Sequence, residues 1–346
     1  MVSYRIKKSF IFFLLILFVG NYFSAYTQTN TGGFITPRMR VIMDNDFAGD
    51  PDGLFALTHL LLSPSVEVRA IIGSHLKPTD GFDRSKVQAE NAANKAKDLV
   101  ALINKQNKIP IIAGSNVALI NENTPVKSDA VNFIIKEALR TDTKLPLYIL
   151  CGAGLTEIAS AYLTDPSIAS RMTLIWIGGP EYKDLAYPPP NVGNPEYNLA
   201  IDTAAARVIF NKSSIPVWQV PRNAYRQAII SYSEILLKIK PQGKVGAYLA
   251  DVLQTLIEKI QKYLNLGEVY ILGDSPLVLL TALQSSFEAD PSSSDYVTKH
   301  APFINEKGDY EMNDNGRNIR VYTRLDIPLM FNDFFAKLEL LNQQNH

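Results

Sequence analysis

Four aspartates stand close together near the start of the sequence, within the segment DNDFAGDPDG at 44–53. Four carboxylates in nine residues repel one another unless protons or a cation neutralise them. A hard divalent cation held by oxygen atoms is the natural partner for such a group. The segment therefore predicts a cation site built from some of its four aspartates, which are Asp44, Asp46, Asp50 and Asp52.

A purely structural role explains only part of this segment. Asp50 precedes Pro51, and this pair favours a helix start because Asp caps helices and Pro fits the first helical position. That role leaves the two aspartates of the DND triplet without a structural reason. An EF-hand loop counted from position 44 would place Ala48 and Phe55 at ligand positions, which excludes that motif.

The elements that must position these acids follow an alternating pattern. Short β-rich apolar runs alternate with longer segments of helical periodicity, which predicts one α/β domain with a mostly parallel central β-sheet, flanked by helices, and a Rossmann-like core. Ligands bind such sheets at the carboxyl ends of the strands. We expect strands at 40–44, 66–73, 110–113, 147–151, 173–177 and 215–220. We expect helices at 51–62, 85–104, 128–140, 155–163, 202–210, 232–263, 275–284 and 328–341, with a polar excursion at 285–317.

The first residues have the pattern of a secretory signal peptide. Three basic residues before position 10 precede the apolar run FIFFLLILFV at 10–19, and small and polar residues follow. We therefore expect a signal peptide at 1–27, a polar linker at 28–37 and the α/β domain at 38–346, with export to the periplasm or the extracellular space. The alternative, an uncleaved membrane anchor, has a run shorter than the ~20 apolar residues that span a bilayer.

Charge and cysteine content exclude several classes of protein. Basic and acidic residues number 34 each, and removing the three basic residues of the leader (34 − 3) leaves 31 against 34. The chain therefore lacks the net positive charge that would favour nucleic acid as a partner. Cys151 is the only cysteine, so the chain can form no intrachain disulfide and no cysteine-based zinc cluster.

Five segments together resemble the inosine-uridine preferring nucleoside hydrolase family, of which the chain looks like a divergent, exported member. Each lies at a predicted strand end or just after it, and they occur in the family's order. The resemblance implies a calcium-dependent hydrolase that splits the N-glycosyl bond of purine or pyrimidine ribonucleosides. The segments are DNDFAGDPDG at 44–53, CGAGLTEIASAYLTDP at 151–166, IWIGGP at 175–180, NPEYNLAIDTAAARVIF at 194–210 and ILGDSPLVLLTAL at 271–283.

The same resemblance implies the metal site. Asp46 corresponds to the acid that binds calcium and accepts a proton from the attacking water, and Asp274 corresponds to the late acid that completes the coordination. A backbone carbonyl of Cys151 or Gly152 supplies a further ligand. Asp52 and Gly53 stand where the family has a pair of aspartates, so the second acid is missing. Asp50 is close enough in sequence to substitute for it.

The resemblance also implies the contacts to substrate. Glu196 and Asn198 match residues that bind the ribose hydroxyls, together with Asn191 or Asn194, and Asp52 is a further candidate for substrate contact. Many family members have a histidine before the late acid that protonates the leaving base, and this chain has Gly273. His75, at the end of the second predicted strand, could contact the leaving group or simply cap its loop.

Three functions are compatible with these residues. The first is the calcium-dependent nucleoside hydrolase, with a small nucleoside or related glycoside as substrate and a possible homo-oligomeric state. The second is a non-catalytic or altered-specificity protein that binds glycosides or nucleosides in the same fold, suggested by Gly53 and Gly273. The third is a haloacid-dehalogenase-like phosphohydrolase with Asp44 as nucleophile and Asp46 as acid and base, although Phe47 and Ala48 depart from that motif.

Overall fold

The computed structural model describes residues 34–103, 109–193, 195–285 and 293–344. The expected signal peptide at 1–27 and most of the expected linker lie outside these residues. Within them, no helix has both the length and the apolar character needed to cross a membrane.

One eight-stranded sheet organises the molecule, with strand order β3-β2-β1-β4-β5-β6-β12-β9. All neighbouring strands pair in parallel except β9, which runs antiparallel to β12. The chain first builds outward from β1 to β3 and then returns to β4 on the other side of β1. The strands are β1 (Met39–Asn45), β2 (Val66–Gly73), β3 (Ile111–Ala113), β4 (Leu147–Cys151), β5 (Met172–Ile177), β6 (Val217–Val220), β9 (Asp295–His300) and β12 (Asn318–Arg324).

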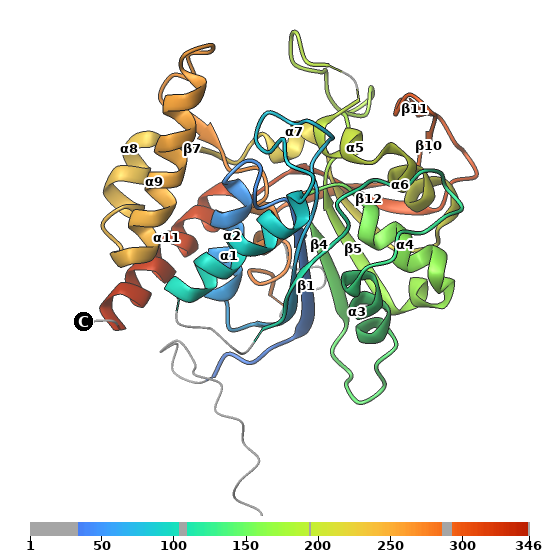
Figure 1. The fold of residues 1–346 in the computed structure, drawn as a ribbon, viewed down its shortest axis with the longest axis horizontal. Helices are drawn as coiled ribbons and strands as arrows, with labels where there is room; N and C mark the ends of the chain where they lie inside the picture. The colour runs from blue at the N-terminus through green and yellow to red at the C-terminus, as the bar shows by residue number, and fades with distance from the viewer. Residues whose placement is uncertain (1–33, 104–108, 194, 286–292, 345–346) are drawn as a thin grey trace, which may run out of the picture.

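Helices cover both faces of the sheet (Figure 1). Along β1, Val41 and Met43 belong to one hydrophobic core and Ile42 to the other, as strand alternation requires. The first core packs against α1 (Asp52–Leu61), α2 (Gln88–Leu102), α9 (Gly243–Ile260), α10 (Pro276–Leu279) and α11 (Ile327–Gln344). The second packs against α3 (Asp129–Ala138), α4 (Thr156–Thr164) and α6 (Thr203–Arg207). The expected α/β fold with a mostly parallel sheet is therefore confirmed.

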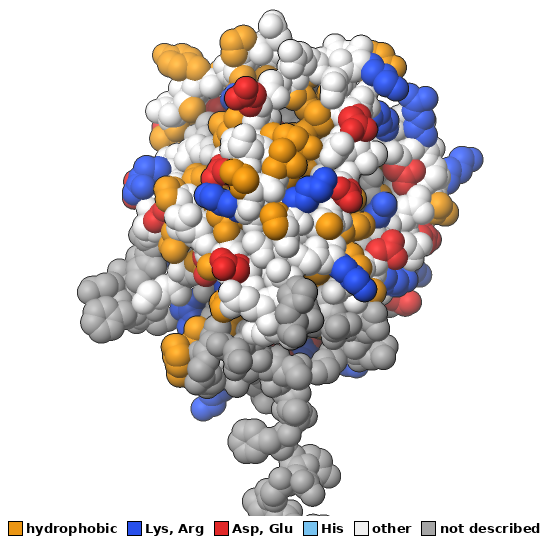
Figure 2. All heavy atoms as spheres, turned by 90° about the vertical axis from the view of Figure 1, so that its left-hand side faces the viewer, with side chains coloured by type: hydrophobic (Ala, Val, Ile, Leu, Met, Phe, Trp, Pro, Cys, Tyr) orange, Lys and Arg blue, Asp and Glu red, His pale blue; other side chains and the backbone are white. Residues whose placement is uncertain are grey.

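Smaller elements connect these layers. Two antiparallel pairs lie outside the main sheet, β7 (Ile229–Ser231) with β8 (Val269–Ile271), and β10 (Phe303–Ile304) with β11 (Tyr310–Glu311). The remaining helical segments are α5 (Tyr197–Ile201), α7 (Arg222–Tyr225), α8 (Tyr232–Glu234), a 3-10 helix at Pro166–Arg171 and π-helical segments at Val208–Lys212 and Ile235–Ile239. Figure 2 views the side that carries α9 and α11, where apolar and charged side chains intermingle at the surface.

Two expectations for the last third of the chain were wrong. The continuous helix expected at 232–263 is divided into α8, a π-helical segment and α9, because Pro241 lacks the backbone N–H that would continue the helix. The polar excursion expected at 285–317 contains β9, β10 and β11. The sequence of β9, DYVTKH, lacks an apolar run since an edge strand with half-exposed side chains does not need one.

Candidate active site

The carboxyl end of β1 brings the predicted acids together. Asp46 follows β1 directly, and Asp52 begins α1. Asp274 arrives from after β8, where its backbone N–H donates to Oδ2 of Asp52 at 3.2 Å. Beside them, the backbone N–H of Gly152 at the end of β4 donates to the carbonyl of Asp44 at 3.1 Å. The site therefore lies between β1 and β4, where strand order reverses and ligands of open α/β sheets bind.

We call Asp46, Asp50, Asp52 and Asp274 the acidic cluster. Asp46 and Asp274 are buried, whereas Asp50 and Asp52 are half-buried. Burial raises the pKa of Asp46 well above its ordinary value, and the neighbouring charges of Asp274 and Asp50 raise it further. Burial and the charge of Asp274 likewise raise the pKa of Asp52. Burial also raises the pKa of Asp50 to about 6 and that of Asp274 to about 7.

The chemistry of this cluster fits a hard cation in charge and donor type. No lysine, arginine or histidine in the described part of the chain forms an ion pair with its carboxylates. Two neighbouring oxygens, Oδ2 of Asp44 and Oδ1 of Asn45, are buried without a hydrogen-bond partner. Unbalanced negative charge and unpaired oxygens are what a calcium ion would satisfy.

The acidic side chains do not, however, form a cation site by themselves. Among the described residues, no three or more His, Cys, Asp or Glu side chains group in a way that could hold a metal ion. Asp50 is held by protein donors, since its Oδ2 accepts from the hydroxyl of Tyr270 at 2.7 Å and its Oδ1 from the N–H of Asp52 at 3.2 Å. A cation would therefore require some rearrangement of these contacts or a ligand of another type.

Glu196 and Asn198 lie at the neighbouring strand end. Glu196 is 2% exposed and caps α5, with Oε2 accepting from the N–H groups of Gly179 at 2.8 Å and Leu199 at 3.1 Å. Its Oε1 accepts from the hydroxyl of Tyr225 at 2.9 Å. Nδ2 of Asn198 donates to the carbonyl of Ile177, the last residue of β5, at 2.8 Å.

Of the two asparagines expected to assist them, the structure describes only Asn191. Asn191 is exposed in the proline-rich loop, where its φ of 60° puts it in the left-handed region. Asn194 lies outside the described residues. Glu196 and Asn198 are therefore the candidate ribose contacts whose surroundings the structure describes, and the contact expected from Asn191 or Asn194 stays a prediction.

Of the two roles expected for His75, a leaving-group contact or a loop cap, the contacts of its ring favour a structural one. The ring is 1% exposed, and Nε2 lies 2.9 Å from Oγ1 of Thr156 while Nδ1 lies 2.8 Å from the carbonyl oxygen of Leu76. The Thr156 hydroxyl in turn donates to Asp202 at 2.7 Å. Because both ring nitrogens are engaged inside the protein, His75 has a structural role in a buried polar network rather than a free face toward substrate.

Two tyrosines that sequence patterns did not assign donate hydrogen bonds to acids of the candidate site. Tyr225 and Tyr270 donate to Glu196 and Asp50, as described above, and burial raises the pKa of both hydroxyls. A Cβ atom at Gly273 would lie 3.3 Å from the ring of Tyr225 and 3.3 Å from Oδ2 of Asp52. The aromatic ring of Tyr225 thus packs beside Gly273, where the resemblance noted in the sequence led us to expect a histidine. Only the folded chain brings these residues together, because the tyrosines follow no spacing rule relative to the acids.

A loop from the strand next to β1 also reaches this region. The hydroxyl of Tyr197, at the start of α5, donates to Oδ2 of Asp80 at 2.9 Å, and Nζ of Lys77 lies 4.1 Å from the centre of the Tyr197 ring. Lys77 and Asp80 both belong to the connection between β2 and α2. The connection therefore reaches across to the segment that carries Glu196.

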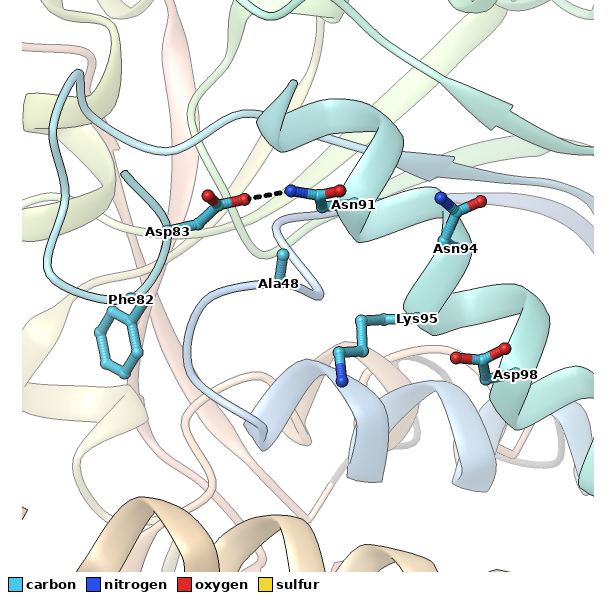
Figure 3. A pocket seen from close by; sticks show the side chains of 7 residues that line it. All are labelled: Ala48, Phe82, Asp83, Asn91, Asn94, Lys95 and Asp98. Atoms are coloured by element: carbon cyan, nitrogen blue, oxygen red, sulfur yellow. Dashed lines mark hydrogen bonds between the residues drawn. The ribbon is translucent and has the colours of Figure 1, made fainter. Parts of the chain in front are cut away.

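A separate hollow of about 300 Å³ lies between the β1–α1 loop and α2 (Figure 3). Asp83 accepts a hydrogen bond from Asn91 at its rim, at 2.8 Å. None of its lining residues belongs to the acidic cluster, so this hollow is distinct from the candidate site. The lining residues are Ala48, Phe82, Asp83, Asn91, Asn94, Lys95 and Asp98.

Comparisons with known proteins agree with this fold. Residues 41–332 match the family model described as inosine-uridine preferring nucleoside hydrolase. No curated protein matches the sequence. A purine-preferring ribonucleoside hydrolase from Gardnerella vaginalis superposes with a TM-score of 0.67 at 18% identity, over 88% of this chain and 99% of the other. An inosine-uridine preferring nucleoside hydrolase from Bacillus anthracis superposes with a TM-score of 0.60 at 15% identity, over 87% and 99%.

Proposed function

This chain belongs to the inosine-uridine preferring nucleoside hydrolase family, and on that premise we propose that it is an exported, calcium-dependent hydrolase of ribonucleosides. As a family member it is a hydrolase that acts on N-glycosyl compounds. The observation that carries the finer proposal is the position of Asp46, buried at the end of β1 beside Asp52 and Asp274. An acid in this place can act on a water molecule at the strand edge where substrates bind.

The residues proposed to hold calcium are Asp46, Asp52 and Asp274, with the backbone carbonyl of Gly152 and with Asp50 nearby. Calcium bound there would supply Lewis-acid chemistry, since a cation lowers the pKa of water that it coordinates. The unbalanced negative charge of the acidic cluster supports this assignment. The identity of the ion is part of the proposal.

In the proposed reaction, Asp46 accepts a proton from water while the water oxygen bonds to the anomeric carbon. The C–N bond breaks with its electron pair leaving on the base, which then takes up a proton from solvent. Glu196 and Asn198 would hold the ribose hydroxyls, which can both donate and accept hydrogen bonds. Positive charge that develops on the sugar would lie beside the carboxylates of the acidic cluster, which stabilise it.

Export is proposed from the basic and apolar pattern of the leader at 1–27. We also propose that the protein acts on small molecules rather than nucleic acid, since the chain without the leader has no excess of basic residues. Assembly into a homo-oligomer, and the absence of stable membrane insertion after processing, are further parts of this proposal.

Hydrolysis of a nucleoside panel tests the main proposal. Purified protein with calcium should release ribose and free base from at least one purine or pyrimidine nucleoside. Asp46→Asn, which keeps the size of the side chain but removes the base, should lower kcat/KM about 10²- to 10⁴-fold. If no nucleoside yields more sugar with the wild type than with Asp46→Asn, the hydrolase proposal is wrong.

A second candidate is a protein of the same fold that binds nucleosides or glycosides with altered specificity or without turnover. It is favoured by Gly53 and Gly273, which stand where relatives carry an acid and a histidine. Calorimetric binding of a nucleoside without release of sugar would select it over the hydrolase. The phosphohydrolase alternative is not retained, because the family model covers residues 41–332.

A further inference from the structure

The missing acid at position 53 has a steric explanation in the structure. A Cβ atom built on Gly53 would lie 2.5 Å from Oδ1 and 2.9 Å from Cγ of Asn45. Real Cβ atoms do not approach other atoms this closely, so the side chain of Asn45 takes the space that a side chain at position 53 would need. Gly53 and Asn45 are therefore a matched pair, in which one residue makes room and the other fills it.

The same amide group borders the other segments of the site. A Cβ atom on Gly152 would lie 2.4 Å from Nδ2 of Asn45 and 2.5 Å from Oδ1 of Asp274. Nδ2 of Asn45 donates to Oδ2 of Asp274 at 2.8 Å. The amide thus lies between the start of α1, the end of β4 and the segment after β8, which are the segments proposed to supply cation ligands.

The orientation of Asn45 leaves one atom unexplained. Its backbone pairs with Gly73 in the parallel ladder, which fixes the direction of the side chain, and its Nδ2 is fixed by Asp274. Oδ1 is then turned to the Gly53 side, fully buried and without a hydrogen-bond partner. A buried acceptor that lacks a donor is costly to a fold, and a cation beside this oxygen would remove that cost.

We propose that Oδ1 of Asn45 is a cation ligand that replaces the carboxylate missing at position 53. Amide oxygens are common ligands of calcium, and an amide brings one negative charge fewer than an acid. The proposal rests on the calcium site of the proposed function but not on nucleoside hydrolysis. It assigns to this chain a ligand set of the acidic cluster plus one amide.

Calcium titration of the full chain by isothermal calorimetry, without nucleoside, tests this assignment. Wild type should bind calcium. Asn45→Ala should bind it more weakly, with a dissociation constant at least tenfold higher. Asn45→Asp keeps an oxygen in this place but loses the Nδ2 donor to Asp274, so it should bind calcium at least as tightly as wild type if the oxygen is the ligand, and more weakly if Asn45 only positions Asp274. Asn91→Ala, which removes an amide from α2 outside the acidic cluster, is the matched control and should bind as wild type does.

The steric pairing gives a second, independent measurement. Gly53→Asp alone should bind calcium more weakly, because the new side chain meets Asn45, whereas Asn45→Ala/Gly53→Asp should recover wild-type binding. Gly53→Asp and Asn45→Asp decide the matter if Asn45→Ala does not fold. The assignment is overturned if wild type binds no calcium, if Asn45→Ala binds as wild type does, if Asn45→Asp binds more weakly than wild type, or if Gly53→Asp alone binds normally. Failure of nucleoside hydrolysis with these binding results intact would overturn only the proposed function.

Discussion

His59, near the end of α1, provides a test of the folded core through its contacts with α11. Its ring lies inside α1, 2% exposed, with its centroid 5.2 Å from that of Phe334 in α11. Nε2 lies 2.7 Å from Oδ2 of Asp333, and Lys337 pairs with the same oxygen at 2.5 Å. Burial lowers the pKa of His59 from 6.5 to about 4, although the hydrogen bond to Asp333 acts in the opposite direction.

The sign and size of the effect on stability follow from this shift. The unfolded chain takes up a proton at His59 below about pH 6.5, and the folded chain does so only near pH 4. The contribution of His59 to the free energy of unfolding is therefore fully present above about pH 6.5 and is lost as the pH falls from there toward 4. A change of one pKa unit corresponds to about 1.4 kcal/mol, so the difference between the pKa of His59 in the unfolded and the folded chain corresponds to about 3 kcal/mol of stability.

The assay is equilibrium unfolding in urea at several values between about pH 7.5 and pH 4.5, at constant salt. His59→Gln is the reference, because glutamine can still donate to Asp333 but does not titrate. The difference in unfolding free energy between wild type and this variant should change by about 2–3 kcal/mol in favour of the variant toward the acid end. A difference that is constant with pH would refute the conclusion that His59 is held neutral by burial.

Three further predictions concern other parts of the molecule. Arg222→Ala removes both hydrogen bonds to the buried carboxylate of Glu181, at 2.7 and 2.5 Å, and should cost about 3–5 kcal/mol in urea unfolding; a loss below about 1 kcal/mol would contradict burial of this pair. Gly246→Ala places a Cβ atom 2.0 Å from the carbonyl oxygen of Ile239 and should cost at least about 1–3 kcal/mol, whereas Gly81→Ala meets nothing within 4 Å and should change stability by less than about 0.5 kcal/mol. Calcium at about 100 times its dissociation constant should stabilise the protein by about 2.7 kcal/mol, and a chelator should reverse the shift in a thermal melt; an unchanged melting temperature would count against calcium binding.

The sequence predicted the strands of the sheet more accurately than it predicted the helices. The six strands from β1 to β6 were expected close to their observed bounds, because a buried parallel strand needs a continuous apolar run and such runs are visible locally. β9 and β12 were not expected, and β9 at the edge has only one neighbour. The division of the long helix before α9 depends on Pro241 and on the packing of Gly246 against Ile239, a contact that periodicity does not encode.

For the candidate site, local sequence identified the acids but not their partners. Asp46 and Asp52 were recognisable because they cluster within a few residues at a strand end, and Asp274 through a resemblance to a family. The contacts of Asp274 with Asp52 and Asn45 join residues more than two hundred positions apart. No local pattern contains such pairings.

What the sequence determined by itself is the α/β class, the order of the first six strands along the chain and the concentration of negative charge after the first, since each depends on neighbours in the chain. The tertiary structure decided that His75 faces inward, that tyrosines line the site and that Asn45 fills the space left by Gly53. The physical reason is that side-chain direction at a strand end depends on which other strand ends lie beside it. That arrangement is set by packing of the whole sheet, not by the residues on either side.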